Sequence, residues 1–152
     1  MENKIDTLTR RMEQSRLRLD AALDKIAPQA EIYPAWKLKQ VLDHITGWDE
    51  LVVEALSAYK KGEPPAFKIK GINQFNAESV ARRKNMTLEQ SRQAYQSARQ
   101  QVLGIMSSLP AEMLSQKYDA PWGGKCTISS IVKIFVSHEE EHARQIEEVY
   151  TG

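Results

Sequence analysis

The sequence has 152 residues, a length that suits one domain with a single hydrophobic core. Its 21 Lys and Arg residues nearly balance 20 Asp and Glu residues, and the formal net charge of +1 argues against nucleic acid or an anionic membrane as a partner. No apolar run is long enough to span a membrane, the amino terminus lacks a secretory h-region, and there is one cysteine, so we expect a cytoplasmic protein.

Apolar residues recur at helical spacing in four segments, which clusters of proline and glycine separate. The predicted helices cover about residues 2–27, 35–60, 87–109 and 127–149. Pro28 ends the first of them, and Gly62 closes the second. Thr87, with Gln90 three residues later, predicts a capping box at the start of the third.

The connections between these helices contain shorter elements. In the long connection over residues 61–86 we expect one short helix, within "GINQFNAESVARRKN". The stretch "PAEMLSQ" predicts another helical turn, and "DAPWGGK" predicts a loop. No segment alternates with period two, so no sheet is expected.

Four amphipathic helices of matched length, each with one apolar stripe to bury, predict an all-α protein. The expected fold is a four-helix bundle that forms a single domain over residues 1–152. The connection over residues 61–86 is long enough to cross from one end of the bundle to the other.

All three histidines of the sequence lie on predicted apolar stripes. His44 lies in the second helix, and His138 and His142 lie one turn apart in the last. One interpretation is that they are buried neutral side chains, each hydrogen-bonded to a neighbour. The i, i+4 spacing, with a further histidine on another helix, favours a metal site instead.

The residue types limit which metal such a site would hold. Nitrogen ligands suit zinc, nickel, copper, cobalt or iron better than calcium or magnesium. A site with three protein ligands keeps an open position, which is typical of catalytic rather than structural centres. The sequence does not choose among these metals.

Residues 138–142 also spell H-E-x-x-H, a zinc signature of metalloproteases. We interpret this match as coincidental, because Gln145 and Glu148 stand where the extended pattern requires glycine and histidine. A di-iron carboxylate site is disfavoured too, because Glu139-x-x-His142 has no second copy in the sequence.

Two local patterns are specific enough to compare with known families. The first is "WKLKQVLDHITGWDE", in which Trp36 opens the second helix and His44 follows by eight residues, and the second is "HEEEHARQI". Together they resemble the DinB/YfiT-like superfamily of four-helix metalloenzymes. Thr127, at the start of the last helix, is also similar. The crossover "GINQFNAESVARRKN" resembles that of the thiol-dependent isomerases and of the ClbS/DfsB branch. The resemblance extends over nearly the whole sequence.

The resemblance implies an up-down-down-up bundle, often a homodimer, in which His44, His138 and His142 hold zinc or nickel. Relatives include S-transferases that use bacillithiol, mycothiol or glutathione, a maleylpyruvate isomerase, and a hydrolase that detoxifies a reactive natural product. The partners to expect are therefore a small-molecule substrate and a low-molecular-weight thiol.

The resulting hypothesis is a metal-dependent S-transferase or detoxifying hydrolase, in which a thiol or water attacks a small electrophilic molecule. Two alternatives stay open: a stress-response bundle that binds a metal or ligand without turnover, and a structural dimer with three buried histidines. Trp48 and Tyr95 are candidates for the pocket, although each also suits plain core packing. Candidates for orienting a histidine ring are Asp43, Asp49, Glu139 and Glu141.

Overall fold

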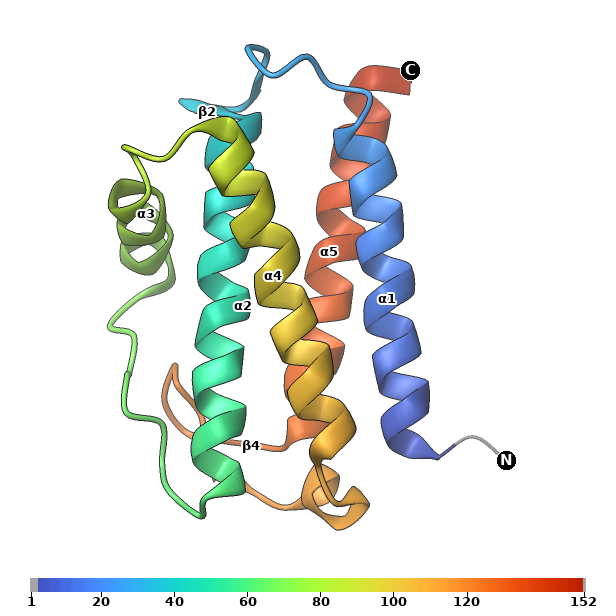
Figure 1. The fold of residues 1–152 in the computed structure, drawn as a ribbon, viewed down its shortest axis with the longest axis vertical. Helices are drawn as coiled ribbons and strands as arrows, with labels where there is room; N and C mark the ends of the chain where they lie inside the picture. Colours follow the sequence, from blue (N-terminus) through green and yellow to red (C-terminus); the bar gives the residue numbers. More distant parts are fainter. Residues whose placement is uncertain (1–2, 152) are drawn as a thin grey trace.

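Four long helices form a bundle in the computed structural model, which describes residues 3–151 and the side chains of residues 3–148. The elements in chain order are α1 (Lys4–Leu23), β1 (Glu31–Tyr33), β2 (Trp36–Lys37), α2 (Leu38–Lys60), α3 (Ile72–Arg82), α4 (Leu88–Ser108), the 3₁₀ helix η1 (Ala111–Ser115), β3 (Tyr118–Asp119), β4 (Lys125–Cys126) and α5 (Ile128–Thr151). Figure 1 shows α1 and α5 running in one direction and α2 and α4 in the other. Residues 1, 2 and 152 of the predicted domain lie outside the described residues.

The all-α prediction is confirmed, and each predicted segment contains a helix. The first helix ends at Leu23 rather than at about residue 27. Beyond it the chain forms a tighter 3₁₀-type turn, in which the Ile26 N–H bonds to the Leu23 carbonyl, three residues back instead of four. The predicted capping box is present: Thr87 Oγ1 accepts from Gln90 N at 3.1 Å, and Gln90 Oε1 accepts from Thr87 N at 2.8 Å. Both predicted short helices are present as well, as α3 and η1.

Two short antiparallel hairpins show that the prediction of no sheet is wrong. β1 pairs with β2 around Pro34 and Ala35, and β3 pairs with β4 around a turn that contains Gly123 and Gly124. Trp36, which falls within the predicted helix over residues 35–60, lies in β2 instead. Strands of two or three residues are too short to show the alternation from which strands are predicted.

The apolar core has two clusters, one toward each end of the bundle. The first includes Met12, Leu56, Val102, Met106 and Ile131. The second includes Leu19, Leu38, Val41, Tyr95 and Ile146. Within the bundle, α2 packs mainly on α4, and α1 packs mainly on α5. No helix among residues 3–151 combines the length and the apolar character that crossing a bilayer requires.

The crossover helix α3 packs against α2 at Gly47. A Cβ atom at this position would lie 2.2 Å from Ser79 Oγ and 2.6 Å from Ser79 Cβ. Both distances are far below van der Waals contact, and Ser79 is fully buried. The glycine therefore allows α3 to approach the middle of α2 closely.

We expect Gly47→Ala to destabilise the protein by about 1–3 kcal/mol, as overpacking of a filled contact does, and to push α3 outward. The double variant Gly47→Ala with Ser79→Gly should recover most of this loss. The double variant Gly47→Ala with Ser79→Ala should not, because the Cβ atom that remains at residue 79 still clashes with the new Cβ atom at residue 47. Urea denaturation of the variants measures the effect.

The matched control is Gly104→Ala in α4. A Cβ atom at Gly104 meets nothing within 4 Å, so this variant should gain up to about 1 kcal/mol from helix propensity. A Gly47→Ala protein that is as stable as the wild type would contradict the close packing of α2 and α3.

Candidate functional site

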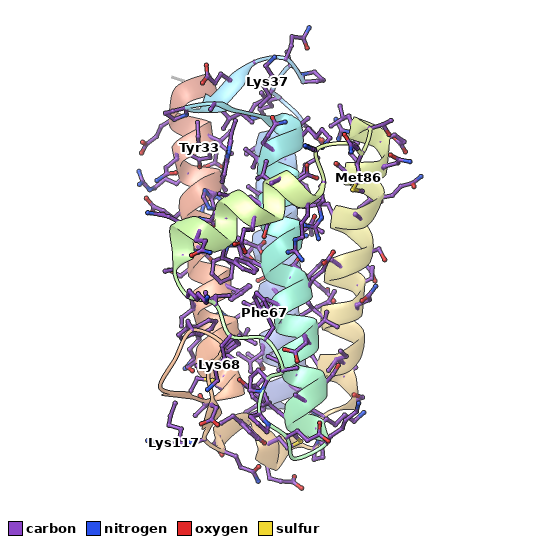
Figure 2. The ribbon with its side chains drawn as sticks, turned by 90° about the vertical axis from the view of Figure 1, so that its left-hand side faces the viewer. Tyr33, Lys37, Phe67, Lys68, Met86 and Lys117 are labelled. Carbon is purple, nitrogen blue, oxygen red and sulfur yellow. The ribbon has the colours of Figure 1, made fainter. Side chains whose placement is uncertain are left out.

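A cavity of about 290 Å³ lies between α2, α3 and α5, on the side of the bundle that Figure 2 faces. Its apolar walls are Ile45, Trp48, Ile72, Trp122, Ile134 and Phe135. Its polar residues are His44, His138, His142, Asp49, Arg99 and Glu139. A shallower depression adjoins it and shares the three histidines, together with Tyr33 and Trp36 of the first hairpin. The histidines therefore lie where the outer depression meets the inner cavity.

The structure brings the three predicted histidines together from two helices. The ring centroids of His44 and His142 lie 5.8 Å apart, and those of His138 and His142 lie 5.9 Å apart. His44 comes from α2, whereas His138 and His142 come from α5. The spacing of one helical turn predicted the second contact, and only the packing of α2 beside α5 creates the first.

The prediction that all three histidines face the core is wrong. His44 is buried, but His142 is half-buried and His138 is exposed. The buried stripe of α5 instead runs through Val132, Val136, Glu139, Ala143 and Ile146. Steps of three and four residues allow two neighbouring stripes on one helix. The sequence analysis chose the stripe with His138 and His142, because a charged residue such as Glu139 is not expected at a buried position.

The surroundings of His44 keep its imidazole neutral. Burial, and then the charge of His142, lower the pKa of His44 to about 4, while a hydrogen bond with Asn76 acts in the opposite direction. Burial and the charge of His138 also lower the pKa of His142. The Nδ1 atom of His44 is buried without a hydrogen-bond partner. Neutral imidazoles with a free nitrogen are the form that binds a metal.

The first hairpin places two aromatic residues beside the histidines. Tyr33 Oη lies 2.7 Å from His142 Nδ1 and donates to Gln145 Oε1 at 2.8 Å. The Trp36 ring lies 5.0 Å from that of His44, centroid to centroid. Burial, and then the charge of Glu141, raise the pKa of Tyr33 to about 12, so its hydroxyl group is protonated at neutral pH.

The sequence analysis missed Tyr33 as a residue of the site. It is the last residue of β1, directly before a turn at Pro34 and Ala35, and Ala35 has a φ of 69°, in the left-handed region. The Glu31 side chain accepts a hydrogen bond from the Ala35 N–H and holds this turn. Tyr33 and His142 lie 109 residues apart in the chain, so no local signal connects them.

The histidine geometry can be compared with that of a metal site. Zinc–nitrogen bonds of about 2.0–2.1 Å would place the centroids of two imidazoles on one ion roughly 5 Å apart. The two observed separations of 5.8 and 5.9 Å are longer by less than about 1 Å, a difference that side-chain rotation covers. As the side chains stand, the described residues contain no group of three or more His, Cys, Asp or Glu side chains arranged to hold a metal.

Trp48 and Tyr95, the two predicted pocket residues, lie in different places. Trp48 lines the cavity, donates from Nε1 to Asn76 Oδ1 at 2.7 Å, and meets Phe75 edge to face. Tyr95 is buried in the second core cluster, and its hydroxyl donates to Asp20 Oδ1 at 2.6 Å. Tyr95 does not line this cavity, so the structure does not bring it to the histidines.

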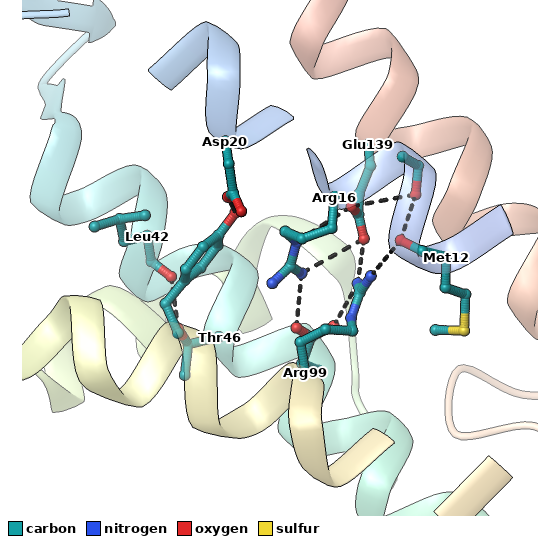
Figure 3. A network of polar contacts seen from close by, with 10 residues as sticks. Met12, Arg16, Asp20, Leu42, Thr46, Arg99 and Glu139 are labelled. Carbon is teal, nitrogen blue, oxygen red and sulfur yellow. Dashed lines mark hydrogen bonds and ion pairs between the residues drawn. The ribbon is translucent and has the colours of Figure 1, made fainter. Parts of the chain in front are cut away.

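A buried ionic cluster takes one residue from each long helix (Figure 3), and three of its members also line the cavity. Its members are Arg16 of α1, Asp49 of α2, Arg99 of α4 and Glu139 of α5. Arg16 donates to Asp49 at 2.8 Å and to Glu139 at 3.2 Å. Arg99 donates to Asp49 at 3.0 Å and also to Glu139. We call these four residues the charged quartet; its formal charge is zero.

The carboxylates suggested as partners of the histidines have other partners. The oxygens of Asp49 and Glu139 face the two arginines, and Asp43 accepts from Lys39 at 2.7 Å. Glu141 pairs with Arg144 and accepts from the Gln145 side chain at 3.3 Å. Within the described residues no carboxylate bonds directly to a histidine ring. Both oxygens of Glu139 face arginines, and the interpretation of H-E-x-x-H as coincidental stays a prediction.

The sequence analysis also missed Arg16 and Arg99. A signal for them existed: Arg16 lies between Met12 and Leu19 on one apolar stripe, and Arg99 lies between Tyr95 and Val102 on another. Charged residues at stripe positions need a partner of opposite charge inside the fold.

Comparisons with known proteins agree with this architecture. The family model of the DinB superfamily matches residues 7–146. No curated protein matches the sequence. The crystal structure of an uncharacterised protein from Escherichia coli UTI89 is similar, with a TM-score of 0.75 and 15% sequence identity, over 97% of this chain and 93% of that chain. At that identity the similarity shows the fold alone.

Proposed function

The chain belongs to the DinB superfamily, and on that basis we propose that it is a metal-dependent enzyme acting on a small electrophilic molecule, as an S-transferase or a detoxifying hydrolase. The observation that supports this most is the convergence of three histidine rings at the edge of an apolar cavity. A mostly apolar cavity with a few converging polar groups is the usual form of a small-molecule site.

The metal would be held by His44, His138 and His142, and zinc or nickel suits these nitrogen ligands best. The buried, unpartnered Nδ1 atom of His44 and the neutral state of that ring support this assignment. A bound divalent metal lowers the pKa of a thiol or water at its open position, which supplies a nucleophile near neutral pH.

The chain's own residues would bind and orient the electrophile. Trp48, Trp122 and Phe135 offer aromatic surface that excludes water, and the bond to Asn76 fixes the Trp48 ring. Arg99, at the charged end of the cavity, can donate to a polar group of the substrate. The cavity of about 290 Å³ suits a small ligand.

A second candidate function is binding of a metal or ligand without turnover. The observation in its favour is that neither carboxylate among the described residues lining the cavity is free to act as a general base, because Asp49 and Glu139 are engaged by Arg16 and Arg99. A stress-response protein that sequesters an electrophile would need the cavity but no base. The homodimer that the resemblance implies stays a prediction.

We expect His138→Ala to lower kcat/KM for thiol conjugation or hydrolysis at least about 100-fold. Loss of a residue that only hydrogen-bonds to a metal ligand typically costs about 10- to 100-fold, and His138 is itself a proposed ligand. The measurement uses zinc- or nickel-loaded protein with glutathione, bacillithiol or mycothiol and an aromatic halide, and a reactive ester for hydrolysis. Lys133→Ala, an exposed substitution on the same helix, is the control. Fully metal-loaded protein without turnover in this screen would favour the binding function instead.

A further inference from the structure

The hydrogen bonds outside the cavity determine which nitrogen of His142 carries the proton. They begin at the Glu141 side chain, which accepts a hydrogen bond from Arg144 Nε at 3.2 Å. It accepts from Gln145 Nε2 at 3.3 Å. This contact makes the nitrogen of the Gln145 amide face Glu141 and leaves its oxygen, Oε1, for Tyr33.

Tyr33 has one hydroxyl proton and two close neighbours. Gln145 Oε1, at 2.8 Å, has only lone pairs, so it receives that proton. The hydroxyl oxygen must then act as the acceptor at its other contact, 2.7 Å from His142 Nδ1. The opposite assignment would leave two oxygen atoms 2.8 Å apart with no proton between them.

We infer that Tyr33 and Gln145, oriented by Glu141, are positioning residues that hold neutral His142 as the Nδ1–H tautomer and leave Nε2 as its free nitrogen. A neutral imidazole carries one N–H, so a proton on Nδ1 guarantees a lone pair on Nε2. The assignment of the tautomer does not depend on the proposed function. The inference rests on that function only in taking a metal as the group that this lone pair binds. Partners of this kind fix the tautomer of ligating histidines and raise their basicity.

This arrangement depends on the tertiary fold, because its hydroxyl group comes from the first hairpin and its other members come from α5. Tyr33 is presented by the β1–β2 turn, whereas Gln145 and Glu141 lie one turn apart on α5, on either side of His142. Figure 2 shows Tyr33 beside the upper part of α5. The hairpin thus adds to α5 the one hydroxyl group that joins the amide to the imidazole.

The test is the ¹⁵N–¹H spectrum of metal-free protein labelled at histidine nitrogens, at about pH 8, where ordinary imidazoles are neutral. We expect wild-type His142 to show the Nδ1–H pattern. Tyr33→Phe should shift it to Nε2–H, the form that neutral histidine prefers in water. Gln145→Leu should do the same, because the Tyr33 proton would then turn to Nδ1. Tyr118→Phe, at the other end of the bundle, should change nothing.

Zinc affinity, measured by competition with a chelator, is the second readout. Tyr33→Phe and Gln145→Leu should each weaken it about 10- to 100-fold, and Tyr118→Phe should not. An Nε2–H pattern in wild-type His142, or an unchanged pattern in Tyr33→Phe, would overturn the inference. A wild type with the Nδ1–H pattern that takes up no zinc would uphold the tautomer assignment and overturn the metal-dependent function instead.

Discussion

Glu139→Ala is expected to destabilise the protein by about 3–5 kcal/mol, which is the usual effect of removing one partner from a buried ion pair. The substitution leaves Arg16 and Arg99 buried with Asp49 as their one remaining carboxylate. The charged quartet then carries a net positive charge in the middle of the bundle. Urea denaturation measures the change, which is a large fraction of the stability of a domain of this size.

The same helix provides the matched control. Glu141 also pairs with an arginine, Arg144, but both side chains are exposed to solvent. Water screens this pair, so in metal-free protein Glu141→Ala should leave the unfolding midpoint nearly unchanged. Equal losses for Glu139→Ala and Glu141→Ala would contradict the structural role that we assign to the charged quartet.

Removal of the metal is expected to have an effect of similar size. Untagged wild-type protein should contain about one zinc or nickel ion per chain, and His44→Ala should contain little, because His44 is the one proposed ligand on α2. A metal that binds only the folded state adds about 4 kcal/mol of stability when its concentration is a thousandfold above Kd. Mass spectrometry of metal content and thermal unfolding with and without EDTA measure the two effects.

The His44→Ala protein tests whether the stability comes from the metal. In EDTA it should unfold somewhat below wild type, because the substitution removes a buried ring and its hydrogen bond with Asn76. With metal added, only the wild type should gain stability. Absence of metal from both proteins, even after reconstitution, would end the proposal of a three-histidine centre and leave ligand binding as the function to pursue.

The charged quartet and the histidines are connected through the helices that carry them. Glu139 follows His138 directly on α5, and Asp49 lies five residues after His44 on α2. Because Arg16 and Arg99 each bond to both carboxylates, they hold α2 and α5 in one register. The position of His44 relative to His142 depends on this register, so a structural cluster supports the candidate site.

The sequence by itself determined the features that arise from interactions within one or two helical turns. The helices follow from apolar residues three and four apart, the start of α4 follows from Thr87 and Gln90, and the contact of His138 with His142 follows from their spacing. The resemblance to the superfamily, carried by His44 and the last helix, also came from the sequence, and the family match confirms it.

Only the tertiary structure decided which residues meet across helices. The contact of His44 with His142, the bond of Tyr33 to His142 and the charged quartet all join residues that are far apart in the chain. The burial of Glu139 beside an exposed His138 depends on how α5 is rotated against its neighbours. Helical periodicity defines the stripes of each helix but not the rotation and register between helices, because packing and charge pairing across the whole fold set these.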